Sequence, residues 1–329
     1  MTSNALYLGM DAGATKTHAL IADGAGRVRG AGIAGPGNWE GVGLDGALAA
    51  YRDALGQALA EAGVSVEQLS GGGFGLAGFD WPSDTERLAP LLEQLGVPEP
   101  RVLVNDTAVA LRAGTEDGVG VVIIAGTGTT VAGCNAEGER WRTFGEGVEM
   151  GDIGGAADIA RLGLRAVARA YTGAGPETSL TDIYVERYGA SSAIEMLEWI
   201  VRGQAPQPHA SLAPHIFAAA EAGDAVAQGI IREVGAALGG NAAAVASRLG
   251  MEAETFSVVL AGGVFRSRSQ ALVAAIMRPI RAVAPHAHPR ILETLPVVGG
   301  VLLAMEAAGA HPSREVQQRM AGEAAERLG

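Results

Sequence analysis

The chain has 329 residues, of which 48% are hydrophobic and 18% charged, and its formal net charge at pH 7 is -12. This length predicts two domains, and this composition predicts ordinary globular cores. An acidic chain without a basic stripe is a poor candidate for binding nucleic acid.

Cysteine content and hydropathy narrow the class further. Cys134 is the single cysteine, which excludes an internal disulfide and a cysteine metal site within one chain. The first residues lack a basic region followed by a long apolar run, so we expect no signal peptide. No stretch approaches the ~20 apolar residues of a membrane span. The sequence therefore predicts a soluble, cytoplasmic protein without a membrane partner.

The predicted elements of the first third alternate between strands and helices. We expect strands at 6–10, 18–22, near 27–33, 72–76 and 101–104, and helices at 44–62, 85–95 and 107–113. A small-residue turn, Asp11-Ala-Gly-Ala-Thr-Lys-Thr17, joins the first two strands. Lys16 in this turn is the only lysine of the chain, although the sequence has 24 basic residues.

A second copy of the strand–turn–strand pattern follows. Predicted strands at 120–125 and 131–134 flank the turn Gly126-Thr-Gly-Thr-Thr130. At an offset of 112 residues, Thr15 aligns with Thr127, Thr17 with Thr129, and Gly26 with Gly138. This order predicts a duplicated, strand-rich core.

The rest of the chain is predicted to be mostly helical. Helices are expected at 156–171, 180–188, 193–201, 212–222, 225–249, 267–283 and 297–308, with one strand at 256–260. The charged tail beyond His311 is expected to be a frayed helix or disordered.

Two common nucleotide-binding patterns are excluded. No Gly-Lys pair occurs, so the chain has no Walker A loop. Its glycine-rich turns join strand to strand, whereas dinucleotide-binding loops join a strand to a helix. A phosphate site made of hairpin turns would instead present backbone N–H groups from two small-residue turns.

Five motifs in order carry a family resemblance. They are Asp11-Ala-Gly-Ala-Thr-Lys-Thr17, Gly35-Pro-Gly-Asn38, Val104-Asn-Asp106, Ile124-Ala-Gly-Thr-Gly128 and Leu260-Ala-Gly-Gly-Val-Phe265. From about Leu6 to Ala308, the chain resembles the BadF/BadG/BcrA/BcrD-type ATPases. Within them it is similar to the N-acetylglucosamine kinases and archaeal broad-specificity hexokinases, relatives of actin and heat-shock chaperones.

The resemblance implies an architecture. It is the α/β, two-domain actin-like ATPase fold, a duplicated ribonuclease H-like fold with an interdomain cleft. The implied domains are residues 1–115 plus 297–312, and residues 116–296. ATP and sugar would bind in the cleft, whose closure would exclude water. Relatives are often dimers, so a homodimer is expected.

The resemblance also implies the cofactors ATP and Mg²⁺ and the residues that bind them. Asp11 would bind Mg²⁺, although a turn aspartate needs no metal. Lys16 would act as a point charge on the phosphates, the alternative being a solvated lysine. The residues expected to bind the phosphates are Gly13, Thr15, Lys16, Thr17, Gly126, Thr127 and Gly128, and those expected at the adenosine are Gly262, Gly263 and Ser267.

Asp106 is the expected catalytic base, because the family places its base here and a kinase needs a carboxylate near the attacking hydroxyl. It is also a good helix N-cap, as are its neighbours Asn105 and Thr107, so a capping role stays open.

The resemblance places the sugar on residues of both halves. These are Asn38, Asp106, Thr129, Gly145, Glu146, Gly147, Val148 and Asp152. Trp39 would stack on the sugar or fill a wall of the cleft. The family usually has an acidic residue and Gly-Ser after the aspartate, whereas Ile153-Gly-Gly155 follows here. Glu146 and Glu149 add two carboxylates, which would face either the sugar or solvent.

The resulting hypothesis is an ATP-dependent kinase that phosphorylates N-acetylglucosamine on its 6-hydroxyl. Glucosamine, or a broad range of hexoses, is the alternative substrate. The rival of another class is an ATPase that activates or regulates a partner without phosphorylating sugar. Activators of radical dehydratases hold an iron–sulfur cluster with two cysteines per subunit, and this chain has only Cys134.

Overall fold

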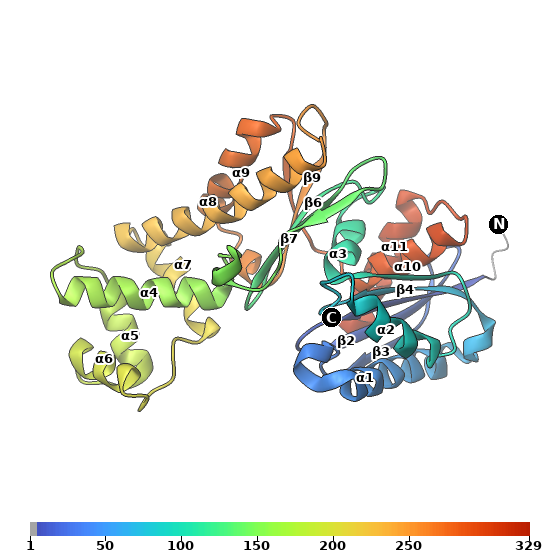
Figure 1. Ribbon diagram of the computed structural model, residues 1–329, viewed down its shortest axis with the longest axis horizontal. Helices are drawn as coiled ribbons and strands as arrows, with labels where there is room; N and C mark the ends of the chain where they lie inside the picture. Colours follow the sequence, from blue (N-terminus) through green and yellow to red (C-terminus); the bar gives the residue numbers. More distant parts are fainter. Residues whose placement is uncertain (1–4) are drawn as a thin grey trace. The chain divides into compact units, whose positions relative to one another are not determined.

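The computed structural model describes residues 5–329, which divide into two compact units (Figure 1). Unit 1 comprises the chain up to Val122 together with Gly133–Glu139 and Arg290–Gly329. Unit 2 comprises Ile123–Ala132 and Arg140–Pro289. The domain ranges predicted from the sequence stay predictions. In the part of the chain from residue 5 onward, no helix combines the length and apolar character needed to cross a bilayer.

The first sheet has five strands in the order β3-β2-β1-β4-β5. They are β1 (Leu6–Ala12), β2 (Thr17–Asp23), β3 (Val28–Ala34), β4 (Leu69–Leu76) and β5 (Arg101–Asn105). The first three form an antiparallel meander, and β4 and β5 run parallel to β1. Carboxyl ends of parallel strands meet at one edge of a sheet, so motifs that follow β1, β4 and β5 are brought together.

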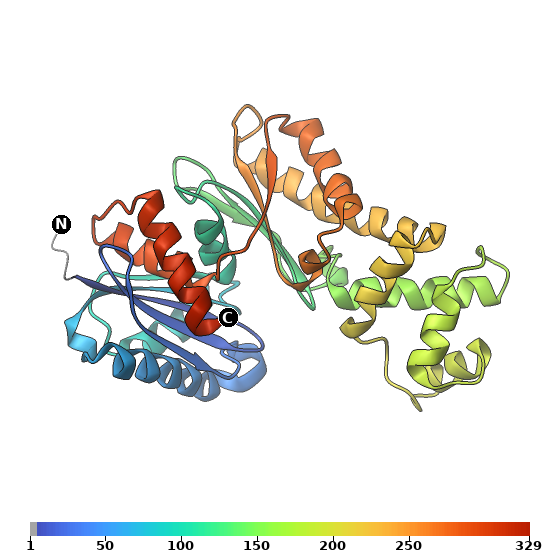
Figure 2. The ribbon, with the colours of Figure 1, turned by 180° about the vertical axis from the view of Figure 1, so that it is seen from behind.

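Helices cover both faces of this sheet. Cluster contacts place α1 (Trp39–Ala62) and α2 (Asp84–Glu93) on one face. The other face carries α10 (Val297–Ala307) and α11 (Arg314–Leu328), and the views of Figures 1 and 2 agree on this arrangement. The short helix α3 (Asp106–Gly114) follows β5 and packs on α10.

The charged tail beyond His311 is ordered, contrary to the expectation from the sequence. Instead of fraying, residues beyond His311 form α11, which begins after its N-cap Ser313. Its Met320, Ala324 and Leu328 are buried in the core shared with α10. These apolar residues are spaced by four, but many charges between them obscure the pattern in the sequence.

The second sheet repeats the topology of the first. Its strands are β6 (Gly120–Ala125), β7 (Thr129–Cys134), β8 (Arg140–Arg142), β9 (Ser257–Ala261) and β10 (His288–Ile291). Their order, β10-β9-β6-β7-β8, read backwards, matches β3-β2-β1-β4-β5 strand for strand. Strands β8 and β10 have only three and four residues, which is too short for an alternating pattern to predict them from the sequence.

The 112-residue offset is borne out in backbone detail. Gly26 and Gly138 both have φ near +80°, at 78° and 81°. Each closes a turn, donating N–H to Asp23 O at 2.8 Å and to Asn135 O at 3.1 Å respectively. Only glycine adopts this left-handed conformation without cost, which explains why the second strand of each copy is followed by the same glycine.

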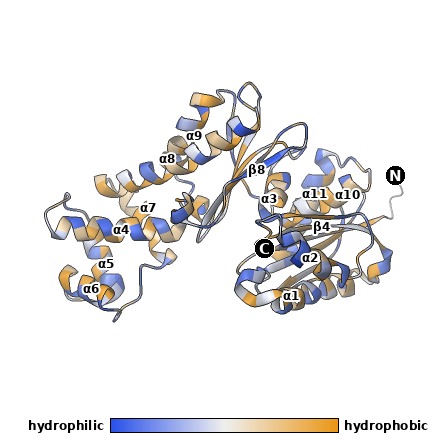
Figure 3. Cartoon of the chain, in the orientation of Figure 1, coloured by the Kyte–Doolittle hydropathy of each residue, from blue (hydrophilic) through white to orange (hydrophobic). Residues whose placement is uncertain are grey.

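Unit 2 is otherwise helical. Its helices are α4 (Ala156–Tyr171), α5 (Leu180–Tyr188), α6 (Ala193–Val201), α7 (Ala213–Glu221), α8 (Ala225–Arg248) and α9 (Gln270–Val283). Helices α8 and α9 approach closely because Gly235 and Gly239 leave no room for a Cβ against Ala275 and Ile276. Helices such as α4 and α9 carry hydrophilic and hydrophobic residues in alternation (Figure 3), as expected for elements with one buried side.

Candidate functional site

The carboxyl edge of the first sheet gathers three of the sequence motifs. Asp11 of β1 lies opposite Gly75 of β4, which in turn lies opposite Val104 of β5. Asp106 follows two residues later as the first residue of α3. The register therefore brings the predicted metal ligand and the predicted base to the same edge, although 95 positions separate them in the numbering.

The turn after β1 is held by the Gly35–Asn38 motif. Gly13 donates N–H to Lys16 O at 3.0 Å, and Gly13 O accepts N–H bonds from Gly37 and Asn38. A Cβ on Gly37 would meet the Thr17 hydroxyl, so glycine is required for this contact. The predicted phosphate turn and the predicted sugar residue Asn38 are thus packed together.

Thr17 differs from its neighbours in the turn. It is fully buried, and its hydroxyl donates to Gly35 O at 2.9 Å. Thr15 and Lys16 are exposed. The Thr17 side chain is used to join the two motifs, and contact with phosphate stays a prediction for all three residues.

Electrostatics connect the acidic residues at this edge. Burial first, and then the nearby Asp106 carboxylate, raise the pKa of Asp11, and Lys16 partly opposes both, so that the pKa is about 7. His18, opposite Asp11 on β2, is buried, and burial followed by the charge of Lys16 lowers its pKa to about 4. His18 is therefore neutral at pH 7, in agreement with the deep position of β2.

The N-cap of α3 is not Asp106 but the residue before it. Asn105 is the N-cap of α3, and its Oδ1 accepts the Thr107 N–H at 3.1 Å and the Thr107 hydroxyl at 2.5 Å. Asp106 is half-buried one position further on. Helix capping therefore explains why Asn105 is present, but it does not explain why Asp106 is.

A loop that the sequence analysis missed joins this group. It follows β4 and contains Gly78, Phe79, Asp80 and Trp81. The Trp39 indole N–H donates to Gly78 O at 2.7 Å. Asn105 Nδ2 donates to Asp80 Oδ1 at 2.9 Å. The available signal was positional: Asp80 follows a strand parallel to β1 and β5, at the same edge of the sheet.

In unit 2, the turn Gly126–Gly128 rests on the N-terminus of α4. The N–H groups of Ala156 and Ala157 donate to Gly126 O at 2.8 Å and to Thr127 O at 3.2 Å. No atom lies within 4 Å of a Cβ built on Gly126 or Gly128, so one side of the turn is open. Thr129, predicted to bind sugar, is buried, and its hydroxyl donates to Ile124 O at 2.8 Å.

The loop from Gly145 to Asp152 folds around the Asp152 carboxylate. Asp152 Oδ2 accepts N–H bonds from Gly145 at 2.7 Å and from Glu146 at 3.2 Å. Asp152 is 1% exposed, and its Oδ1 is one of two buried side-chain atoms without a partner among residues 5–329. Glu146, Val148 and Glu149 are exposed. A buried acceptor of this kind calls for a donor from outside the chain.

The predicted adenosine loop lies beside the turn Gly126–Gly128. Gly262, at φ 102°, packs so closely on Ala125 O of β6 that a Cβ would not fit. Gly263 is exposed, and the Ser267 hydroxyl donates to Val264 O at 2.9 Å. A cavity of about 1120 Å³ is lined by residues of α7, α8 and α9 and by Arg268 and Ser269, which directly follow this loop in the chain.

Comparisons with known proteins point the same way. The model of the BadF/BadG/BcrA/BcrD ATPase family matches residues 8–304. N-acetyl-D-glucosamine kinase of Dictyostelium discoideum is 30% identical over 317 residues, covering 92% of this chain and 98% of that protein. N-acetylmuramic acid/N-acetylglucosamine kinase of Clostridium acetobutylicum is 28% identical over 261 residues, covering 79% and 85%.

Solved structures bear out the fold. A Chromobacterium violaceum protein, provisionally named N-acetylglucosamine kinase, has a TM-score of 0.68 at 23% identity and covers 92% of this chain and 99% of its own. A ROK family glucokinase of Streptomyces griseus, solved with glucose and AMPPNP, has a TM-score of 0.57 at 19% identity, covering 92% and 100%. The duplicated sheets thus form the two-domain, actin-like ATPase fold, as predicted.

Proposed function

The chain belongs to the BadF/BadG/BcrA/BcrD ATPase family, and on that premise we propose that it is an ATP-dependent carbohydrate kinase that phosphorylates a hexosamine. N-acetylglucosamine, phosphorylated on its 6-hydroxyl, is the proposed substrate. The two curated relatives described above, both named for N-acetylglucosamine, support this choice.

The observation that carries the proposal is the electrostatic coupling at the carboxyl edge of the first sheet. Asp106 raises the pKa of Asp11, and Lys16 lowers it, after burial has had the largest effect. Two carboxylates and one ammonium are thus close enough to interact through the low-dielectric interior. Phosphoryl transfer needs these groups: a base for the hydroxyl, a cation for the phosphates and a carboxylate for a metal.

Asp106 is proposed as the catalytic base. It would accept the proton of the sugar hydroxyl as the hydroxyl oxygen bonds to the γ-phosphorus and the bond to the bridging oxygen of ADP breaks. Because the transition state is loose, positioning and charge neutralisation dominate, and a carboxylate of ordinary strength suffices. Lys16, exposed on its fixed turn, would neutralise phosphate charge as a point cation.

Asp11 is proposed to hold Mg²⁺, which when bound neutralises charge on the phosphates. The fit is supported by the chemistry of the site: a half-buried carboxylate next to a second carboxylate is costly to ionise, as its raised pKa records. A divalent cation removes that cost. Carboxylate oxygen is also the ligand that Mg²⁺ prefers.

For unit 2 we propose nucleotide contacts on two neighbouring loops. The open side of Gly126–Gly128 would present the backbone N–H groups of Thr127 and Gly128 to phosphate, as Thr15 would in unit 1. The N–H groups of Gly126 and Gly13 already bond within their turns, to Gly128 O and Lys16 O, so these two glycines would serve by leaving room for the phosphates. Gly262, Gly263 and Ser267 would contact the adenosine. The close packing of Gly262 on Ala125, directly before the turn Gly126–Gly128, supports this pairing of the two loops.

The sugar is proposed to contact the loop from Gly145 to Asp152, with Asn38 and Thr129 as further ligands. The buried Asp152 Oδ1 would accept a hydrogen bond from a hydroxyl or amide N–H group of the sugar. Glu146 is exposed, which leaves room for the alternative in which it pairs with the ammonium of glucosamine. Val148, also exposed, would suit the acetyl methyl group.

A coupled ADP assay over a panel of sugars tests the proposal. We expect ATP consumption to depend on added sugar, with kcat/KM for N-acetylglucosamine or glucosamine above that for glucose. Asp106→Asn should lower kcat by roughly 10²-fold or more while ATP still binds. ATP hydrolysis without sugar dependence would instead favour an activator of another protein, and a preference for glucose would overturn the hexosamine assignment.

Glu146→Gln separates the two hexosamines. A selective loss of kcat/KM for glucosamine would assign the ammonium contact to Glu146. An equal loss for all three sugars, or none, would remove that contact.

A further inference from the structure

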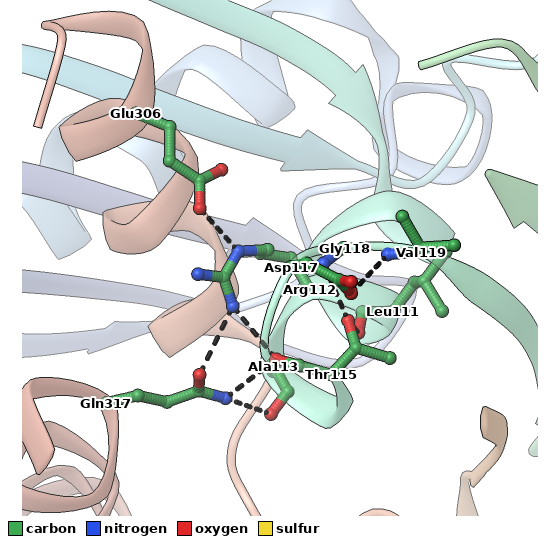
Figure 4. A network of polar contacts seen from close by, with 9 residues as sticks. All are labelled: Leu111, Arg112, Ala113, Thr115, Asp117, Gly118, Val119, Glu306 and Gln317. Atoms are coloured by element: carbon green, nitrogen blue, oxygen red, sulfur yellow. Dashed lines mark hydrogen bonds and ion pairs between the residues drawn. The ribbon is translucent and has the colours of Figure 1, made fainter. Parts of the chain in front are cut away.

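Arg112 is the largest fully buried side chain among the residues described, with 2% of its surface exposed. Its Nε donates to Glu306 Oε1 of α10 at 2.7 Å. Its Nη1 donates to Thr115 O at 2.9 Å and to Gln317 Oε1 of α11 at 3.2 Å (Figure 4). A buried guanidinium is tolerated only when paired and hydrogen-bonded, so Arg112 fixes the positions of three segments at once.

Gln317 completes the other half of this network. Its Nε2 donates to Ala113 O at 3.0 Å and to Thr115 O at 3.1 Å (Figure 4). The last carbonyls of a helix lack partners within the helix. A side chain of the C-terminal helix α11 therefore caps the end of α3, although 203 positions separate Gln317 from Gly114.

The middle of α3 is held by close packing. Val109 lies between Gly75 of β4 and Gly299 of α10. A Cβ on Gly75 would meet the Val109 side chain, and a Cβ on Gly299 would meet Val109 O. Val109 is three residues from Asp106 and three from Arg112. At 1.5 Å per residue, Asp106 and Arg112 lie about 9 Å apart along the helix axis.

Helix α3 is thus held at its middle by the packing of Val109 and at its C-terminal end by Arg112 and Gln317. We call this arrangement the lever, with Val109 as its pivot. Because Asp106 and Arg112 lie three residues to either side of Val109 in one helix of nine residues, a tilt of α3 about Val109 would displace both ends by similar amounts. We propose that Arg112 and Gln317 are positioning residues, which fix the tilt of α3 from its C-terminal end and thereby place Asp106. The inference rests on the proposed function of Asp106 as the base.

The variant Gln317→Leu tests the lever with little change in volume. It removes the two hydrogen bonds that Gln317 donates to Ala113 O and Thr115 O, and one acceptor of Arg112. The Arg112–Glu306 pair remains. We expect kcat to fall by roughly 10-fold to 10²-fold, since misplacement by about 1 Å has such effects. KM for ATP should stay within about twofold, because the displaced carboxylate acts on the sugar hydroxyl and not on the nucleotide. Glu306→Gln, which keeps an acceptor for Arg112, should lose much less.

Met320→Ala is the matched control. Met320 is on the same helix and fully buried in the core with α10. This variant should lower Tm at least as much as Gln317→Leu, yet keep the kcat of the parent at temperatures where both are folded. A purely structural role for Gln317 predicts the same kcat in the two variants at equal loss of Tm, and that result would overturn the lever.

Hydrogen exchange gives a readout that does not require kinase activity. In Gln317→Leu, the amides of α3 should exchange faster than in the parent, whereas in Met320→Ala they should keep their protection relative to global unfolding. Faster exchange in α3 supports the lever even if the parent phosphorylates no sugar, in which case only the proposed function fails. Unchanged exchange in α3 together with parental kcat in Gln317→Leu refutes the lever while the kinase assignment stands.

Discussion

Lys16 combines an exposed side chain with a fixed backbone. Its carbonyl accepts the Gly13 N–H, and the turn is anchored through Gly13 O to Gly37 and Asn38. Arginine serves at every other basic position of the chain. An ammonium is a compact point charge, whereas a guanidinium is a wide planar fork, so the two are not equivalent on a tight turn facing phosphate.

We therefore expect Lys16→Arg to lower kcat although it keeps the charge. Lys16→Met, which removes the charge, should lower kcat further. Steady-state kinetics with ATP and N-acetylglucosamine measure both. If the arginine variant turns over like the parent, the lysine is incidental to the reaction.

Asp11 makes the stability of the ligand-free protein depend on pH. Its pKa in the fold is about 7, mainly because of burial and then because of Asp106, against 3.8 as the ordinary value. A raised pKa means that the folded protein favours protonated Asp11. The contribution of Asp11 to the free energy of unfolding is therefore present in full below pH 3.8 and is lost as pH rises through 7. At pH 8 Asp11 is ionised in the folded protein, which lowers the free energy of unfolding.

Asp11→Asn should remove that cost. Relative to the parent, the Tm of the variant should rise as pH increases from 5 to 8, in thermal unfolding without ligand, because the parent alone becomes ionised there. Added Mg²⁺ should narrow the difference by stabilising the parent. A difference in Tm that stays constant over this range would contradict the coupling of Asp11 to its surroundings.

At the scale of elements, Asp224 shows how one side chain joins two helices. Its carboxylate accepts N–H bonds from Val226 and Ala227 at the start of α8, both at 2.9 Å. It also accepts from the Thr178 hydroxyl at 2.8 Å and from the N–H and hydroxyl of Ser179, the N-cap of α5, at 2.7 and 2.8 Å. Burial alone would raise the pKa of Asp224, but these hydrogen bonds lower it to about 2.

Asp224→Ala should destabilise the protein by about 1–2 kcal/mol at pH 7, as the loss of an N-cap does. A lowered pKa gives stability that is present above pH 3.8 and lost as pH falls through 2. The difference in unfolding free energy between parent and variant should therefore shrink over that window. Ser192→Ala removes a neutral N-cap, from α6, and its effect should not follow the same pH dependence.

At the scale of the whole molecule, the open edge of the first sheet is covered by side chains. Strand β3 is an edge strand, and N–H groups of such strands invite pairing with another chain. Here Val28 N–H donates to Glu323 of α11 at 2.8 Å, and Ala31 N–H donates to Glu61 of α1 at 2.8 Å. Gln57 accepts from Ile33 N–H at 3.1 Å and donates to Ile33 O at 2.9 Å.

Removing this cover should expose the edge. We expect the triple variant Gln57→Ala, Glu61→Ala, Glu323→Ala to form larger species with increasing concentration, as seen by light scattering after size exclusion. The control Glu93→Ala, Glu326→Ala also removes acidic side chains, both of them exposed, and should behave like the parent. Identical elution of the triple variant and the parent would show that the side chains do not protect the edge. The homodimer expected from the family resemblance remains a separate prediction.

The sequence by itself determined the parts of the protein that depend on local order. The spacing of apolar residues located α4, α5 and α6 with the bounds that the structure has. The 112-residue offset between Gly26 and Gly138 indicated the duplication, because each copy needs glycine at the same left-handed position. The five motifs were enough to identify the family.

Only the tertiary structure decided which of several equivalent residues takes each role. Asn105 and Asp106 are both good caps in the sequence, and the cap is Asn105. The buried position of Thr17, the loop at Asp80, and the packing of α11 through Gln317 onto α3 all depend on contacts between distant segments. Such contacts are set by the register of parallel strands and by which helix covers which face. No local pattern in a single sequence encodes these long-range choices.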